Sequence, residues 1–274
     1  MSKIINWGIL GPGKIAKKFA LGLSYVPNAN LYAAASRSLE KAKDFSAEMG
    51  ADKAYGSYTE MLNDPKVDAI YIATPHVFHY EHTLLCLKHK KPVLCEKPFA
   101  MNKDQVKEMI DFAQKQDTFL MEAMWTHFLP HFKYTKEVIK SGKYGKVLAM
   151  EADFGFDAPF NANSRIYNKA LGGGSLLDIG IYPIFAALSF LGKPEKIEAT
   201  AKMTKTEVDA RCHATFFYPE NVKAELYSFV DKHTDVAATI KLEKAEIYIK
   251  PRFHQPSSVV ITTENDSFTK EFGV

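Results

Sequence analysis

The chain has 274 residues, of which 46% are hydrophobic and 24% charged, and its formal net charge is +3. This length exceeds that of most single domains and favours two. Because the charge is small and Lys and Arg are interspersed with acids, we expect no nucleic-acid partner and no polybasic membrane surface. The N-terminus lacks the long apolar core of a signal peptide, and we identify no apolar stretch long enough to span a bilayer. Three widely spaced cysteines without a CxxC pair indicate a reducing, cytoplasmic environment.

The first 123 residues alternate short β-rich runs with amphipathic stretches, a pattern typical of βαβ units around a parallel sheet. The pattern predicts strands at 5–10, 31–36, 54–55, 69–73, 93–96 and 119–122. It predicts helices at 14–24, 39–49, 58–62, 78–89 and 103–116, the last of them capped by Asn102. We therefore assign residues 1–123 to a Rossmann domain of the α/β class.

Residues 124–274 have a different pattern, in which strands follow one another with turn-forming residues between them. After a helix at 132–141, strands are predicted at 147–154, 197–203, 211–217, 223–229, 236–241, 245–249 and 258–263. One helix, at 175–191, interrupts the series and stops at Gly192. We expect an α+β domain with a mostly antiparallel, open-faced sheet.

A Gly-rich turn follows the first predicted strand. Gly11 permits the tight turn, Gly13 lets the backbone approach a pyrophosphate, and Ala16 allows close packing of helix and strand. Lys14 and Ile15 begin the helix whose N-terminus faces the anion. A GxGxxA turn alone is weak evidence, but its position between a strand and a helix near the N-terminus predicts a dinucleotide site.

The end of the second strand indicates which dinucleotide binds. NAD enzymes place an acid there, whereas this chain has Ser36, Arg37 and Ser38. The guanidinium fork suits a 2′-phosphate and the serine hydroxyls add donors, so we expect NADP rather than NAD. The alternative is that Arg37 is a solvated loop residue and Ser38 a helix cap.

Polar residues also close the fourth strand, at the edge where open α/β sheets bind ligands. Thr74, Pro75, His76 and His79 are candidates to line the cofactor crevice. Since no acid or cysteine cluster accompanies the histidines, we expect no metal site.

The fifth strand leaves the sheet at Glu96-Lys97-Pro98, which directs Lys97 towards the nicotinamide end of the crevice. The GxGxxA turn and this EKP strand end together resemble the glucose-fructose oxidoreductase/inositol dehydrogenase (Gfo/Idh/MocA) family. The resemblance is strongest to its branch of dimeric dihydrodiol dehydrogenases and NADP-dependent xylose dehydrogenases. Further blocks carry it, namely Ala35 to Ser38, Met124-Trp125, Phe128 to Pro130 and Gly172 to Pro183.

The resemblance implies a catalytic pair of Lys97 and Tyr182, with Asp178 one helical turn before the tyrosine. In a helix that follows the glycines, Asp178 and Tyr182 would share one face. An ammonium beside a phenol favours the phenolate, so Tyr182 would take the substrate's hydroxyl proton while hydride leaves the same carbon. The alternative is that Tyr182 packs in the domain interface and that Asp178 is a first-turn acid favoured by the helix dipole.

Substrate contacts are expected from the aromatic residues after the sixth strand, Trp125, His127 and Phe128, and from Arg165 before the glycines. An aromatic cluster can equally belong to a core. Two departures from the branch stand out: His127 replaces the usual arginine, and relatives usually continue beyond Val274.

The sequence thus predicts an NADP-dependent oxidoreductase that acts on a sugar, such as the aldose xylose, or on a cyclic trans-diol. Two alternatives are a non-catalytic NADP-binding regulator and an NAD-dependent inositol or amino-sugar dehydrogenase. We also expect a homodimer, because helix covers one face of the antiparallel sheet and the family resemblance places the subunit contact on the other. Alternating apolar residues such as Phe217, Leu226 and Ile240 motivate this expectation, although some of them must serve the core.

Overall fold

The computed structural model describes residues 3–273 and divides the chain into two compact units. The first unit ends at Met124 and the second begins at Trp125. The predicted domain boundary fell between residues 123 and 124.

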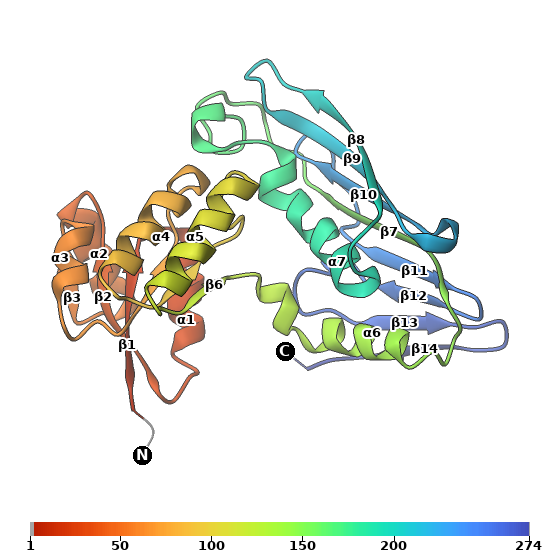
Figure 1. Cartoon of the computed structure of the whole chain (residues 1–274), viewed down its shortest axis with the longest axis horizontal. Coiled ribbons are helices and arrows are strands. Elements are labelled where there is room, and N and C mark those ends of the chain that lie inside the picture. Colours follow the sequence, from red (N-terminus) through yellow and green to blue (C-terminus); the bar gives the residue numbers. More distant parts are fainter. Residues whose placement is uncertain (1–2, 274) are drawn as a thin grey trace. The chain divides into compact units, whose positions relative to one another are not determined.

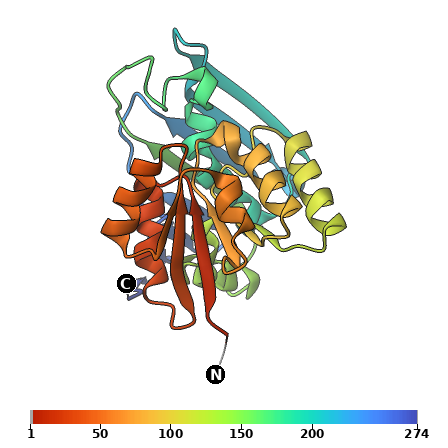
Figure 2. The same ribbon diagram turned by 90° about the vertical axis from the view of Figure 1, so that its left-hand side faces the viewer.

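The first unit is a six-stranded parallel sheet with helices on both faces (Figures 1 and 2). The strand order is β3-β2-β1-β4-β5-β6, the order of a doubly wound dinucleotide-binding fold. Its strands are β1 (Ile5–Leu10), β2 (Ala29–Ala35), β3 (Lys53–Tyr55), β4 (Ala69–Ile72), β5 (Val93–Cys95) and β6 (Leu120–Glu122). Its helices are α1 (Lys14–Leu23), α2 (Leu39–Met49), α3 (Tyr58–Asn63), α4 (His79–Lys88) and α5 (Lys103–Lys115).

Alternating residues of the central strands point into two separate apolar layers, one on each face of the sheet. Ile9 packs with Ala16 of α1 and Phe45 of α2 on one face. The next residue, Leu10, packs with residues of α3, α4 and α5 on the other. Successive strand side chains point to opposite faces, so a continuous apolar strand is buried on both sides. The predicted α/β class and parallel sheet are confirmed.

Local capping residues determine several helix starts. The Asn102 side chain accepts from the Gln105 backbone N–H at 3.0 Å, which confirms the predicted cap. Several predicted boundaries differ from the observed ones by one or two residues. For example, the helix predicted from residue 78 begins at His79, because His76–Phe78 form a 3₁₀ turn after Pro75.

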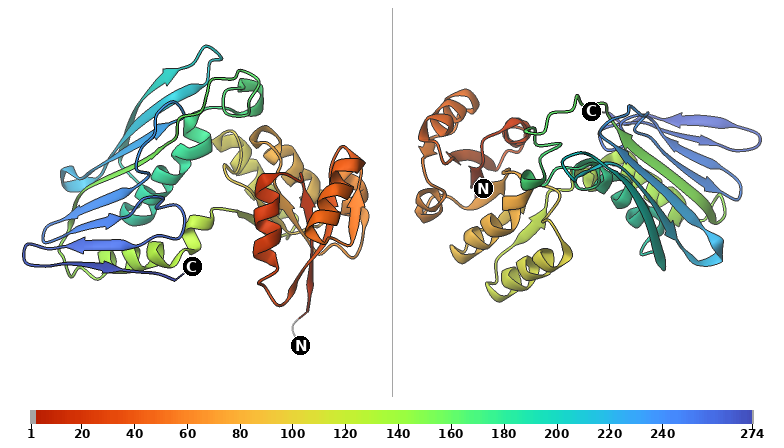
Figure 3. Two further views of the ribbon diagram at one scale, coloured as in Figure 1. Left: turned by 180° about the vertical axis from the view of Figure 1, so that it is seen from behind. Right: turned by 90° about the horizontal axis from the view of Figure 1, so that it is seen from above.

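The second unit is an eight-stranded sheet with two helices on one face (Figures 1 and 3). The strand order is β14-β13-β12-β11-β7-β10-β9-β8, and every neighbouring pair is antiparallel except β7 and β10. Its helices are α6 (Pro130–Lys140) and α7 (Ile181–Leu191). Its strands are β7 (Val147–Gly155), β8 (Lys196–Met203), β9 (Asp209–Phe217), β10 (Lys223–Phe229), β11 (Ala238–Leu242), β12 (Glu246–Ile249), β13 (Val259–Thr262) and β14 (Ser267–Lys270). The mostly antiparallel sheet is confirmed, whereas the prediction omitted β14.

The two faces of this sheet differ in their side chains. Leu226 and Ile240, considered in advance as residues of the open face, are 2% and 0% exposed and belong to the covered face. The open face instead carries partly exposed side chains such as His213, Glu225 and Tyr227 from the alternate positions of β9 and β10. Side chains in β9, β10 and β11 therefore alternate between the two faces as expected, and Leu226 and Ile240 lie on the covered face.

The segment predicted as one α-helix over 175–191 is not regular. Leu176–Gly180 form a π-helical turn, and α7 begins only at Ile181. The wider segment Lys169–Leu191 contains an 18-residue window with a mean hydropathy of 1.6 and is long and apolar enough to cross a membrane. This corrects the expectation that no such stretch exists. Since 56% of its apolar window is buried within the protein, it is equally typical of a core helix.

Candidate cofactor and catalytic sites

The turn after β1 has the geometry of a phosphate-binding loop. Gly11 has φ +93°, and a Cβ there would lie 2.7 Å from Cγ2 of Thr74, so both conformation and space require glycine. At Gly13 a Cβ would meet no described protein atom within 4 Å, and φ is −138°. Gly13 is also the N-cap of α1. The space beside it is where a pyrophosphate would approach the helix N-terminus, so the loop fits a dinucleotide.

Lys14 and Ile15 occupy the first turn of α1 and are exposed, whereas Ala16 is fully buried against the sheet. The small side chain of Ala16 thus allows the close approach of helix and strand that the fingerprint requires.

The loop after β2 presents Arg37 to solvent between two serines. The Ser36 hydroxyl accepts from the Ser38 backbone N–H at 3.3 Å, and the Ser38 hydroxyl accepts from Lys41 N–H at 3.4 Å. Ser38 is therefore the cap of α2, which was the alternative considered for it. The Arg37 guanidinium lies over the Phe78 ring, 5.6 Å from its centroid.

Thr74, Pro75 and His76 lie at the carboxyl end of β4, as expected from the strand prediction. His79 is fully buried: its Nδ1 lies 2.7 Å from the Pro98 carbonyl oxygen and its Nε2 2.8 Å from that of Thr74. Burial lowers the pKa of His79. His79 is thus buried where it connects the loops after β4 and β5.

Two half-buried acids surround the Lys97 loop. Glu96 accepts hydrogen bonds from the Tyr71 hydroxyl and, at 3.2 Å, from the Lys97 backbone N–H. Glu122, at the end of β6, accepts from the Phe99 N–H at 3.0 Å. Burial raises the pKa of both carboxyls, while the nearby Lys97 charge opposes that rise. Sequence reasoning missed Glu122, although its position at a strand end was the available signal.

In the second unit, aromatic rings surround the Tyr182 phenol. The Trp125 indole N–H donates to the Tyr182 hydroxyl at 3.3 Å. The His254 ring lies 4.9 Å from the Tyr182 ring, and Phe154 lies 5.5 Å from it, measured between centroids. Tyr182 is 7% exposed. The structure therefore brings Trp125 to Tyr182 and adds Phe154 and His254, which sequence reasoning missed.

Asp178 and Arg165 form an ion pair, with an Arg165 nitrogen 2.9 Å from a carboxylate oxygen of Asp178. Asp178 is buried at 7% exposed. Its carboxylate therefore orients Arg165, one of the residues predicted to contact substrate. Asp178 lies in the π-helical turn and Tyr182 in α7, so the regular α-helical spacing assumed for them does not hold.

The glycines before this turn are closely packed rather than a flexible loop. A Cβ at Gly173 would lie 2.6 Å from the Ile166 carbonyl oxygen, and one at Gly174 would lie 2.2 Å from a carboxylate oxygen of Asp209. The same carboxylate accepts from the Ser175 hydroxyl and the Leu176 N–H, both at 2.6 Å. Asp209 thus fixes the start of the segment that carries Asp178.

His127 and Phe128 are exposed in a 3₁₀ turn, and their rings contact each other at 5.0 Å between centroids. His127 also lies 6.1 Å from Phe185 of α7.

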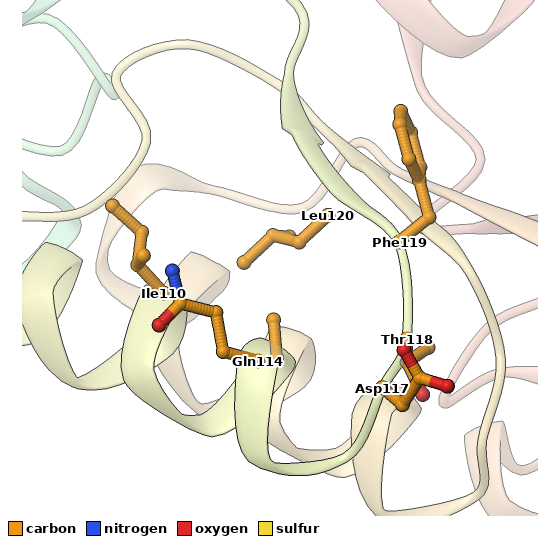
Figure 4. A pocket seen from close by; sticks show the side chains of 7 residues that line it. Ile110, Gln114, Asp117, Thr118, Phe119 and Leu120 are labelled. Atoms are coloured by element: carbon orange, nitrogen blue, oxygen red, sulfur yellow. The ribbon is translucent and has the colours of Figure 1, made fainter.

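A hollow of about 360 Å³ lies at the outer edge of the first unit (Figure 4). It contains none of the predicted site residues and is lined by Ile110, Ala113, Gln114, Asp117, Thr118, Phe119 and Leu120. Over residues 3–273, no group of three or more His, Cys, Asp or Glu side chains has the arrangement of a metal site.

Comparison with known proteins supports this reading of both units. Residues 5–124 match the oxidoreductase family with an NAD-binding Rossmann fold, and residues 132–248 match the GFO/IDH/MocA C-terminal domain. Trans-1,2-dihydrobenzene-1,2-diol dehydrogenase from Mus musculus is 36% identical over 268 residues, which are 96% of this chain and 80% of the mouse protein. The Homo sapiens enzyme of that name is 34% identical, with the same coverage.

Solved structures agree. KijD10, a 3-ketoreductase from Actinomadura kijaniata in complex with NADP and TDP-benzene, superposes with a TM-score of 0.89 at 26% identity, covering 98% of this chain and 84% of that one. An aldose-aldose oxidoreductase from Caulobacter crescentus complexed with glycerol also gives 0.89, at 25% identity and the same coverage. The resemblance predicted from the motifs is confirmed: the chain belongs to the Gfo/Idh/MocA family of NAD(P)-binding oxidoreductases.

Proposed function

We propose that the chain is an NADP-dependent dehydrogenase acting on a CH–OH group of a sugar, such as an aldose, or of a cyclic trans-diol. The observation that carries the proposal is the aromatic cluster around Tyr182. It holds a buried phenol whose hydroxyl is hydrogen-bonded to Trp125, and the chain belongs to a family of oxidoreductases, in which such a phenol can serve as acid or base. The named activities of the relatives, on a diol, a keto group and aldoses, share the interconversion of carbinol and carbonyl.

Residues of the first unit would hold the cofactor by its phosphates. Gly11 and Gly13 leave room for the pyrophosphate at the α1 N-terminus, and Arg37 offers a guanidinium to the 2′-phosphate. NADP, when bound, supplies a nicotinamide that accepts or donates hydride. The binding of NADP by KijD10 is consistent with this choice.

Proton transfer is assigned to Tyr182, and Lys97 is assigned to stabilise the phenolate and the substrate oxygen. The cluster of Trp125, Phe154 and His254 would exclude water from the phenol and present flat apolar surfaces to a substrate ring. Arg165, oriented by Asp178, has further guanidinium donors for a substrate hydroxyl. His127 and Phe128 are proposed as further substrate contacts.

A substrate panel tests the function. The purified protein is mixed with NADP⁺ or NAD⁺ and with aldoses, inositols and cyclic trans-diols, and formation of reduced cofactor is followed by absorbance. We expect turnover of an aldose or a trans-diol, faster with NADP⁺. Binding of NADP without turnover of any compound would favour a non-catalytic regulator, and activity on inositol with NAD⁺ would favour the inositol dehydrogenase alternative.

The open face of the second sheet is proposed as a homodimer contact. Tyr227 lies there, stacked on His213 at 4.5 Å between ring centroids, and Phe229 is its neighbour at 6.2 Å. Such partly exposed aromatic residues are typical of interface cores. Light scattering at micromolar concentration should give a dimer mass, and Tyr227→Glu should give a monomer; a monomeric unmodified protein would contradict the proposal.

A cytoplasmic location also remains a proposal. It rests on the three thiols Cys86, Cys95 and Cys212, all of which are free and buried.

A further inference from the structure

A contact between a cation and an aromatic ring joins two loops at the carboxyl end of the first sheet. The Arg37 guanidinium carbon lies 5.6 Å from the centroid of the Phe78 ring. Arg37 follows β2, whereas Phe78 ends the 3₁₀ turn after β4. These two strands lie on either side of β1 (Figure 1). The contact therefore crosses the carboxyl end of β1, where Gly11 begins the phosphate-binding turn.

The Phe78 ring also contacts a histidine ring. The His82 ring stacks on it with 5.6 Å between centroids and 24° between planes. His82 is held by the Thr74 hydroxyl, 3.0 Å from its Nδ1, and by the edge of Tyr58 at 4.9 Å. Burial lowers the pKa of His82 to about 4, and the Arg37 charge contributes to that shift. At neutral pH the His82 ring is therefore uncharged and does not repel the guanidinium.

Arg37 has no competing ionic partner in the part of the chain that the structure describes. Its side chain is exposed, and within residues 3–273 no Asp or Glu carboxylate pairs with it. A carboxylate would occupy the N–H groups that a phosphate needs. Attraction to a ring face acts on the delocalised charge and leaves those donors available. The contact thus restricts the Arg37 side chain but does not use its N–H donors.

We propose that Phe78 is a positioning residue for the 2′-phosphate of NADP, because its ring holds the Arg37 guanidinium where that phosphate binds. The proposal rests on the NADP binding proposed above. An arginine already restricted by the ring loses less conformational freedom when the phosphate arrives, so the ring favours binding of NADP. NAD lacks this phosphate, so the ring should affect the choice between the two cofactors.

Calorimetric titration of NADP⁺ and NAD⁺ into the full chain tests the role of the ring. In Phe78→Leu, which keeps an apolar side chain but removes the π face, the Kd for NADP⁺ should rise about threefold to tenfold. The Kd for NAD⁺ should change less than about twofold. Phe78→Tyr keeps the ring and should retain the preference. In an Arg37→Ala background, Phe78→Leu should leave the ratio of the two Kd values unchanged.

The possible failures are distinguishable. If the unmodified protein binds NADP⁺ no better than NAD⁺, both the NADP assignment and the role of Phe78 are wrong. If the unmodified protein prefers NADP⁺ and Phe78→Leu retains that ratio, only the role of Phe78 is wrong. Equal weakening of both cofactors would make the ring a general wall of the nucleotide site and would also overturn the proposal. Phe78→Met provides a second variant should the leucine variant not fold.

Discussion

Two glycines of one turn are required for different physical reasons. At Gly11 the protein imposes the requirement, since φ is +93° and Thr74 occupies the space that a Cβ would need. At Gly13 the described protein leaves that space open, so a ligand would impose it.

Substitution of the two glycines by alanine should therefore separate folding from binding. Gly11→Ala should lower the free energy of unfolding by about 1 to 3 kcal/mol, because it combines a clash with a strained φ. Gly13→Ala should change stability by less than about 1 kcal/mol yet weaken NADP binding at least tenfold. Urea unfolding and cofactor titration of both variants check this. Equal effects of the two substitutions on stability would contradict the account.

The sequence predicts the role of a residue when its partners are only a few residues away in the chain. Ser38, Asn102 and the Gly11 turn lie within a few residues of their partners, so strand and helix signals suffice to place them. His254 and Phe154 could not be predicted, because they reach Tyr182 only through the pairing of distant strands. The full burial of His79 could not be predicted, because its partner, the Pro98 carbonyl, comes from the end of another strand.

The start of the segment that carries Asp178 and Tyr182 depends on one acid of another element. Asp209 of β9 accepts from the Ser175 hydroxyl and from the Leu176 N–H. The Leu176 N–H is one of the backbone donors that a helix start leaves without an intrahelical partner. Periodicity predicted a helix here but could not reveal the π-helical turn. That turn lies where Gly180 approaches Ser228 of β10, whose Oγ would be 3.0 Å from an added Cβ.

Removal of this acceptor should loosen the segment. Asp209→Ala should lower the free energy of unfolding by about 1 kcal/mol, because the Ser175 hydroxyl and the Leu176 N–H lose the acceptor that they share. Turnover should fall as well, since Asp178 and Tyr182 follow directly. Asp209→Asn retains an acceptor oxygen and should lose less. The measurement is the urea midpoint of each variant, and a midpoint unchanged in Asp209→Ala would show that the contact does not fix the helix start.

Across the whole molecule, buried histidines link stability to pH. Burial lowers the pKa of His79 and His131, and that of His82 to about 4. Below pH 6.5 the unfolded chain protonates these side chains before the folded protein does, so stability should fall as the pH falls. The raised pKa values of Glu96 and Glu122 act in the opposite direction, which makes a comparison with a variant necessary.

His82→Asn isolates one of these groups and can retain a polar contact with Thr74. Between about pH 6 and pH 4.5 the stability advantage of the unmodified protein over the variant should shrink by up to about 1.4 kcal/mol per pH unit, because one proton fewer is bound on unfolding of the variant. Denaturant unfolding at several pH values measures the difference. Parallel pH profiles of the two proteins would contradict the predicted neutral state of His82.

Both sheet types were predictable because the sequence pattern changes near residue 124. Before it, strands alternate with helical stretches; after it, strands mostly follow one another directly. The edge strand β14 was not, since Ser267–Lys270 is short, polar and exposed and gives no apolar alternation. Which of the alternating apolar residues serve the core could not be predicted either, because alternation alone does not say which face α7 covers; Leu226 and Ile240 are the buried ones.

Our central proposal is that Tyr182 transfers the proton and that Lys97 stabilises the phenolate and the substrate oxygen in an NADP-dependent oxidoreductase. Steady-state turnover of Tyr182→Phe, Lys97→Met and the double variant, with NADP binding measured in parallel, tests it most directly. Each single variant should lose at least about two decades of turnover, with NADP affinity within about threefold and a combined loss less than additive. Turnover of Tyr182→Phe close to that of the unmodified protein would contradict the account, since the phenol would then not be the acid or base.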